Sequence, residues 1–155
     1  MNANTQSSSL DLLDATLDDL SDLPSNQPFP AGAHAAKLFL TIPKAKPGEV
    51  AKHLVIAKFK YQSTLEATDA TAVLPNENDE ATVFMNLKLK DGTPNQYSEG
   101  TLKMILVAFR DGGMQGATNR ALIEEASKGV DVVVVTSISM YKDQAQMNIV
   151  KIMMA

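Results

Sequence analysis

Few residues in this 155-residue chain have the types and spacing that catalysis or metal binding requires. The two histidines, His34 and His53, each stand at the start of an apolar segment, and no acidic residue lies at a motif spacing from either. Chain order alone leaves open a spatial triad with a serine and an aspartate. Glu77, Asp79 and Glu80 could touch a divalent cation, but no glycine is placed for an EF-hand turn, so a solvated loop is the better interpretation. We expect no catalytic residue, no metal site and no cofactor.

The glycine-rich segment "RDGGMQGATN", residues 110–119, invites a phosphate-loop interpretation. It lacks the GxxxxGK[ST] pattern, and it follows a helical pattern rather than a strand. We therefore interpret it as a connector between two helices.

Lysines and aromatic residues share faces of three apolar segments, which suits nucleic-acid binding. Proteins that bind single-stranded nucleic acid need cations for the phosphates and exposed aromatic rings on which bases stack. Residues 37–60 hold six lysines and one glutamate. Lysines on the outward face of a strand also serve solubility and edge protection, and only 5% of the residues are aromatic, so that alternative stays open. The DNA-binding surface that we predict consists of Lys37, Phe39, Lys58, Lys60, Phe84, Lys88, Lys90, Arg110 and Tyr141.

Hydrophobic periodicity predicts the elements that would position these residues. Alternation predicts strands over 34–42, 53–61 and 81–92, and β-branched residues predict a final hairpin over 130–141 and 146–154. Helical spacing predicts helices over 98–109, capped by Ser98, and 119–128, capped by Asn119 and ended by Gly129. Residues 66–80 are expected to form an acidic loop.

The order of these elements predicts the fold. A mainly β domain is expected, a five-stranded OB-like Greek-key barrel with its helical segment between strands 3 and 4. A generic α+β sandwich is the alternative, and the position of the helix favours the OB-fold by analogy. We expect residues 31–155 to form this domain, preceded by an acidic, largely disordered leader and proline-rich linker over residues 1–30.

The leader holds all of the net negative charge. The whole chain has 14 basic and 18 acidic residues, a net charge of −4. Five aspartates and no basic residue precede Pro24, so the remainder carries 14 basic and 13 acidic residues. Leu10, Leu13, Leu17 and Leu20 recur at helical spacing, and we expect this short segment to become helical where it docks. The partner-binding residues that we predict are Leu10, Leu13, Leu17, Leu20, Asp18 and Asp19.

Composition also sets expectations about compartment. The chain has no cysteine, which excludes disulfides and thiolate chemistry and fits a reducing interior. No apolar run is long enough to cross a bilayer, and the acidic start is unlike a secretory signal. We expect a soluble intracellular protein with no membrane partner.

Three stretches resemble parts of a known family: "LDDLSDLP", the junction "PFPAGAH" and "GVDVVVVTSISMYKDQAQMNIVKI". Over most of residues 14–155 the layout is similar to small bacteriophage OB-fold single-stranded-DNA-binding proteins. The resemblance implies sequence-nonspecific DNA binding in phage replication and recombination, in the cytoplasm of the infected host, without catalysis or a cofactor.

The resemblance also implies roles for the leader. Many such binders carry an acidic, partly apolar tail that docks on replication proteins or competes with DNA, and the tail is usually at the C-terminus. This chain ends in "NIVKIMMA", without an acid, so the leader is the candidate here. It could instead pack on the body or on a sister subunit, and a homo-oligomer is open. The alternative function is a phage structural or adaptor protein that acts through protein–protein contacts.

Overall fold

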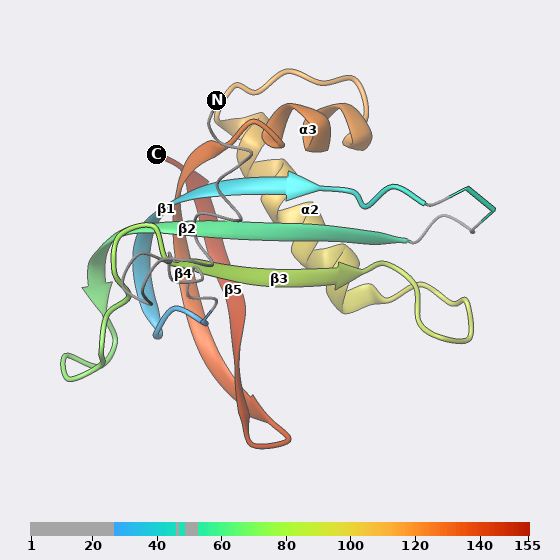
Figure 1. Ribbon diagram of the computed structural model, residues 1–155. Helices are drawn as coiled ribbons and strands as arrows, with labels where there is room; N and C mark the ends of the chain where they lie inside the picture. Colours follow the sequence, from blue (N-terminus) through green and yellow to red (C-terminus); the bar gives the residue numbers. More distant parts are fainter. Residues whose placement is uncertain (1–26, 46, 49–52) are drawn as a thin grey trace, which may run out of the picture.

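The computed structural model describes residues 27–45, 47, 48 and 53–155. Five antiparallel strands form one sheet in the order β3-β2-β1-β4-β5, which curls into a nearly closed, OB-like barrel (Figure 1). The elements are β1 (Gly32–Thr41), β2 (Leu54–Ala67), β3 (Glu80–Asn86), α2 (Gln96–Asp111), α3 (Asn119–Ala126), β4 (Val130–Tyr141) and β5 (Gln144–Met154). The predicted fold, with its helices between β3 and β4, is confirmed.

The core lies inside the barrel because β1 occupies the centre of the sheet and alternates strictly between its two faces. Its inward side chains His34, Ala36, Leu38 and Leu40 are all fully buried. Tyr61 continues the buried face of β2 and is core. The helix α2 contacts β3 and β5, the two edges of the sheet, and α3 lies against β1. The remaining buried positions of the strands and helices include Val55, Ala57, Phe59, Met85, Ile105, Phe109, Ile123, Val132 and Val134.

Bulges give the sheet its curvature. The register of β1 against β2 shifts between Ala33 and His34 and again between Ala35 and Ala36, so Leu65 and Gln62 of β2 have no direct partner on β1. The register of β4 against β5 shifts after Val135, where Val150 is the extra residue. Bulges increase local twist and bend a strand, and this allows five strands to wrap around one core.

The helix boundaries correct the predicted caps. Asn95, rather than Ser98, caps α2, and its side-chain oxygen accepts a hydrogen bond from the Ser98 backbone N–H at 3.4 Å. Thr118, rather than Asn119, caps α3 through the Ala121 N–H at 3.1 Å. Both helices begin earlier along a run of polar residues that can all cap, and the sequence alone does not choose among them.

The third strand is shorter than predicted. It ends at Asn86, and residues 87–95 form a loop in which Leu89 N–H donates to the Thr93 carbonyl. Asp91 accepts hydrogen bonds from the Thr93 hydroxyl and backbone N–H, which lower the pKa of the Asp91 carboxyl. Pairing of β3 with β2 therefore ends at Asn86, although apolar and polar residues continue to alternate as far as Leu89.

The linker contributes to the core. Phe29 is fully buried, and its ring packs edge-on against His34 and Tyr61. The Gln27 backbone N–H donates to the Glu80 carbonyl at 3.0 Å, which fixes the start of the described chain beside β3. The predicted leader residues, including Leu10, Leu13, Leu17, Leu20, Asp18 and Asp19, lie outside the described residues.

A chain of hydrogen bonds holds His34 as a neutral imidazole. The Pro30 carbonyl can only accept, so His34 Nε2 carries the proton that it donates over 2.6 Å. His34 Nδ1 then accepts from the Thr64 hydroxyl at 2.9 Å, and Tyr61 donates its hydroxyl to Thr64 at 2.6 Å. Burial lowers the pKa of His34, and the bond to the Pro30 carbonyl only partly opposes this effect.

We predict that acid destabilises the protein through His34. Its pKa is lower folded than unfolded, so the unfolded chain takes up the proton first as pH falls below about 6.5. The free energy of unfolding that neutral His34 contributes is fully present above that pH. It is lost on acidification, by at most about 1.4 kcal/mol per pH unit. Urea unfolding between pH 7.5 and 5.0 should show the loss in the wild type and a flatter profile in His34→Gln. The exposed His53 provides the control, because His53→Gln should keep the wild-type profile. Equal acid sensitivity of wild type and His34→Gln would contradict this assignment.

Candidate nucleic-acid interface

The outward face of β1, β2 and β3 brings together five of the nine predicted DNA-binding residues. Alternation places them opposite the core, and strand pairing sets Phe39 beside Lys58 and Lys37 beside Lys60. Phe84 of β3 pairs with Ile56 of β2 on the same face. The five residues on this face, which we call the outer face, are Lys37, Phe39, Lys58, Lys60 and Phe84.

A shallow concavity of about 420 Å³ lies on the outer face. Its lining combines one aromatic ring and aliphatic groups with two lysines and one carboxylate: Phe39, Thr41, Ile56, Lys58, Lys60, Glu80 and Ser127. Such a surface can hold a phosphate against an ammonium group while a base lies on an apolar side chain. Ile56 was not among the predicted site residues, although it lies on the same face of β2 as Lys58 and Lys60.

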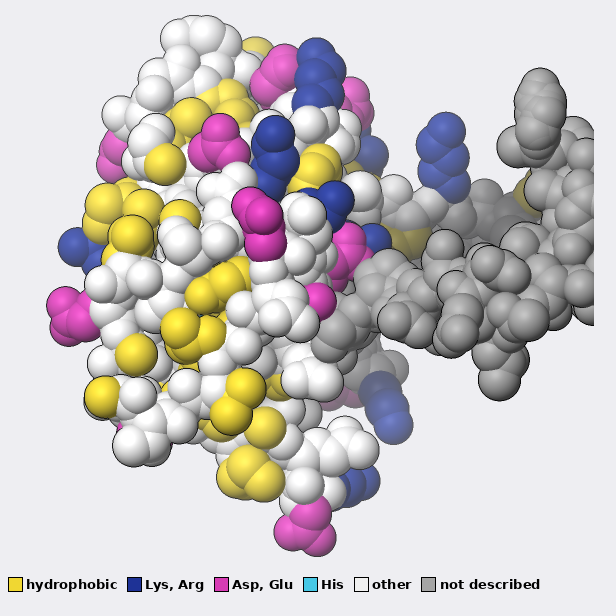
Figure 2. Space-filling model, turned by 60° about the vertical axis from the view of Figure 1, so that its left-hand side comes forward, with side chains coloured by type: hydrophobic (Ala, Val, Ile, Leu, Met, Phe, Trp, Pro, Cys, Tyr) yellow, Lys and Arg dark blue, Asp and Glu magenta, His cyan; other side chains and the backbone are white. Residues whose placement is uncertain are grey.

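The electrostatics of the outer face are mild. The Lys58 ammonium lies 4.0 Å from the Glu80 carboxylate, and Asp131 is the cross-strand neighbour of Lys37. Three lysines therefore face two carboxylates. Figure 2 shows the same mixture on a neighbouring side of the molecule, where basic and acidic side chains lie beside one another near the top. A face of this kind gives modest, salt-sensitive affinity for phosphates.

The two phenylalanines of the outer face differ in accessibility. Phe84 is 60% exposed, so a base could stack on its ring. Phe39 is half-buried and lies over Gly129, where a Cβ atom would stand 2.9 Å from the ring carbon Cε1. Gly129 has φ +101°, and glycine therefore both adopts this backbone conformation and leaves room for the ring. Phe84 is the more accessible stacking surface.

The other four predicted DNA-binding residues lie away from the outer face. Lys88 and Lys90 belong to the loop after β3, where Lys88 pairs with Pro94 in an isolated bridge. Their predicted alignment with Phe84 on one strand is wrong, because the strand ends at Asn86.

Arg110 and Tyr141 also lie on other elements. Arg110 is in the last turn of α2, 3.9 Å from the Asp111 carboxylate. Tyr141 ends β4 at the hairpin tip, where the Lys142 ammonium stands 5.4 Å from its ring centre. The turn at Lys142 and Asp143 has positive φ at both residues, as the type I′ hairpin geometry requires.

Tyr97 was not among the predicted site residues. It is 69% exposed in the first turn of α2, and its hydroxyl donates to Asn148 Oδ1 of β5 at 3.1 Å. A pocket of about 400 Å³ between the two sheet edges is lined by both Tyr97 and Phe84, together with Pro28. No sequence signal pairs these two rings, because hydrophobic periodicity does not give the angle at which α2 packs after the loop that follows β3.

Of the residues considered for catalysis and metal binding, His34 and Asp79 make hydrogen bonds within the fold. Both nitrogens of His34 are hydrogen-bonded in the core, and His53 is exposed just before β2. Asp79 Oδ2 accepts from the Asn76 backbone N–H at 2.9 Å, within the loop between β2 and β3. Within residues 27–45, 47, 48 and 53–155, no three histidine or acidic side chains cluster as a metal site would require.

Comparisons with known proteins add no family to this picture. No protein-family model matches the chain, and a search of curated proteins finds no significant match. In the part of the chain that the structure covers, no helix is both long and apolar enough to span a membrane. The fold and the outer face therefore carry the functional argument.

We predict that Gly129→Ala is more destabilising than Gly113→Ala. Both glycines have φ near +100°, so both substitutions carry the backbone cost, but a Cβ at Gly113 meets no atom within 4 Å. The contact with Phe39 and Lys37 should add about 1 kcal/mol to the loss at Gly129. Urea unfolding of the two variants measures the difference. Equal losses would mean that the Phe39 ring does not rest over Gly129.

Proposed function

We propose that this protein binds single-stranded DNA without strong sequence preference, as a non-enzymatic component of phage DNA replication or recombination. One observation carries the proposal: β1, β2 and β3 of an OB-like barrel present three lysines and an exposed phenylalanine on one outward face. OB-folds use this surface for oligonucleotides, with aromatic stacking and backbone neutralisation in place of base readout.

Each component of the outer face has a distinct part in this proposal. Lys58 and Lys60 neutralise phosphates and release counterions. Phe84 offers a stacking surface, with Ile56 beside it as apolar support. Glu80 weakens phosphate binding at Lys58, so a single domain binds modestly. Function would then draw on cooperative packing along the strand or on several linked copies.

Exposed apolar side chains on the β4–β5 hairpin support a second candidate function. The β4–β5 hairpin exposes Ile138, Met140 and Tyr141, and Met140 is 67% exposed. Exposed apolar side chains at a projecting hairpin suit a contact with another protein. A phage structural or adaptor protein is therefore the alternative, and an intact body without DNA affinity at low salt would favour it.

We predict that Lys58 and Lys60 make salt-dependent contacts with the DNA backbone. Fluorescence anisotropy with a labelled oligo-dT of about 30 nucleotides should show binding by the full chain that weakens as salt rises. Lys58→Ala with Lys60→Ala should lower the affinity and reduce the slope of log K against log salt by about 1.4, since each lost contact to a single strand removes about 0.7. Glu80→Gln should shift the affinity in the opposite direction.

The matched control removes two exposed cations from the helices. Lys103→Ala with Arg120→Ala has the same change in net charge but leaves the outer face intact. If this control loses as much affinity as the Lys58 and Lys60 variant, net charge and not the outer face governs binding. No binding by the full chain at low salt would overturn the proposed function itself.

We predict that the exposed ring of Phe84 stacks on a base. Phe84→Ala should weaken oligo-dT binding by about 1–3 kcal/mol, the range for loss of one stacked base, with a stability loss below about 1 kcal/mol. Leu65→Ala removes a similarly exposed apolar side chain (61% exposed) from the far part of β2 and should leave binding unchanged. Unchanged affinity in Phe84→Ala would remove this ring from the site. A larger stability loss would show that the ring supports the fold.

A further inference from the structure

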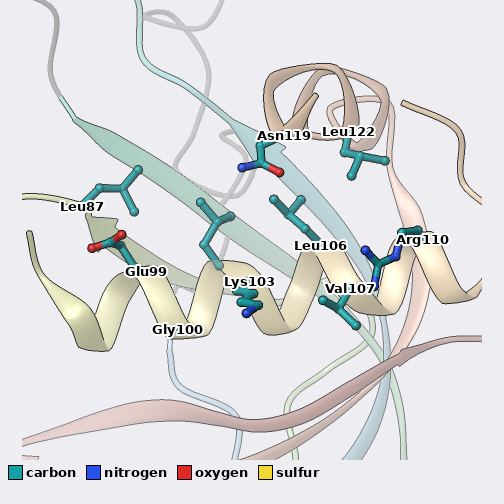
Figure 3. A pocket seen from close by; sticks show the side chains of 10 residues that line it. Leu87, Glu99, Gly100, Lys103, Leu106, Val107, Arg110, Asn119 and Leu122 are labelled. Atoms are coloured by element: carbon teal, nitrogen blue, oxygen red, sulfur yellow. The ribbon is translucent and has the colours of Figure 1, made fainter. Parts of the chain in front are cut away.

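A groove of about 500 Å³ runs along α2 on the flank that faces α3 and the end of β3. Leu106 of α2 and Leu122 of α3 project into it, and Leu87 closes it beside β3 (Figure 3). Lys103 and Arg110 follow one another along α2 at its side, and Glu99 lies nearer the Leu87 end. The groove therefore offers an apolar floor with two cations beside it. It is lined by none of the residues of the outer face.

We propose that residues 9–20 of the same chain dock in this groove as an amphipathic helix, with residues 21–26 as its connection to the body. The segment reads "SLDLLDATLDDL", with leucines at helical spacing and four aspartates without a basic residue. Its leucines can pack on the apolar floor of the groove. Its aspartates are opposite in charge to Lys103 and Arg110.

The dimensions of the two surfaces agree. From Leu10 to Leu20 a helix advances by about 15 Å, at 1.5 Å per residue. The part of α2 that lines the groove runs from Glu99 to Arg110, which is about 17 Å by the same measure. The leucine stripe thus has the length of the groove, and neither end would leave a leucine beyond it.

The charges also agree in spacing. Lys103 and Arg110 are seven residues apart, which is two helical turns, and so are Asp11 and Asp18. An antiparallel arrangement sets Asp18 beside Lys103 and Asp11 beside Arg110. The Asp111 carboxylate, 3.9 Å from Arg110, competes for that cation, but both side chains are 70% exposed and the pair is weak.

The connection to the body permits this arrangement within one chain. The start of the described chain is held at Gln27, beside Glu80 at the beginning of β3. From there, the seven residues back to Leu20 reach about 25 Å when extended, and the distance from Glu80, at the start of β3, to Leu87, just past its end, is about 23 Å for an extended chain. Pro28 also lines the same pocket as Tyr97, in the first turn of α2. The leader therefore reaches the Glu99 end first, which gives the antiparallel direction.

Docking on α2 leaves the outer face open. The outer face has lysines two residues apart on a strand, which does not match the two-turn repeat of the aspartates. The leader would therefore mask the α2 groove and would not compete with DNA. A replication protein that binds the leader would have to displace it from the groove first.

Disulfide cross-linking tests the proposal in the full chain, which contains no cysteine of its own. Ser21→Cys is combined with Gly100→Cys, because a side chain at Gly100 points into open space within the groove. The reach control combines Ser21→Cys with Ser63→Cys, an exposed site on β2 three residues beyond Lys60, whose partner Glu80 holds Gln27. Under mild oxidation the Gly100 pair should close within one chain at least about tenfold faster than the Ser63 pair.

Charge reversal completes the test. Lys103→Glu with Arg110→Glu should abolish the advantage of the Gly100 pair, and adding Asp11→Lys with Asp18→Lys should restore it. All four sites are polar, and circular dichroism checks that each variant is folded. Equal rates for the Gly100 and Ser63 pairs would overturn the proposal, as would disulfide-linked dimers, which indicate docking between copies. Both outcomes are independent of oligo-dT binding, so the proposed function stands or fails separately.

Discussion

The register of β1 against its two neighbours is the constraint on which the rest of the structure depends. In a strand, side chains alternate with a period of two, so a slip of one residue would move Lys37 and Phe39 into the core and Leu38 and Leu40 into solvent. The buried row of β1 and its pairing with β2 and β4 make such a slip costly. The bulges at Gln62 and Leu65 then bend the sheet without changing which face of β1 is buried.

The neutral network around His34 fixes the end of β1 that the bulges would otherwise loosen. It joins the Pro30 carbonyl, Thr64 and Tyr61, and Thr136 of β4 also donates to the Pro30 carbonyl at 2.8 Å. Three strands and the incoming linker are therefore tied at one buried point, and every polar group there has a partner. Buried polar groups specify a structure only when they are satisfied, which is the case here.

The two proposed surfaces use charge differently. On the outer face, lysines lie among carboxylates, so attraction to a polyanion is weak at each site and grows only over several contacts. Along α2, two cations stand beside an apolar floor, and this combination suits a single amphipathic segment. The proposed docking site along α2 gives the acidic leader a physical role, because its aspartates pair with Lys103 and Arg110. The outer face then stays open for DNA.

The sequence by itself determined the strands, the helical segment between β3 and β4 and the alternation that separates Lys58 and Lys60 from Phe59 and Tyr61. These features follow from local periodicity, which each strand carries within itself. Only the tertiary structure decided that Phe29 enters the core, that β3 stops at Asn86 and that Tyr97 shares a pocket with Phe84. The burial of Phe29 depends on contacts with β2, which is distant in the chain. The end of β3 depends on the side-chain hydrogen bonds of the turn that follows it, and the shared pocket forms when the sheet curls and α2 packs against both of its edges. The period of a pattern shows which face of a strand is apolar, and barrel closure determines which residues of different elements meet.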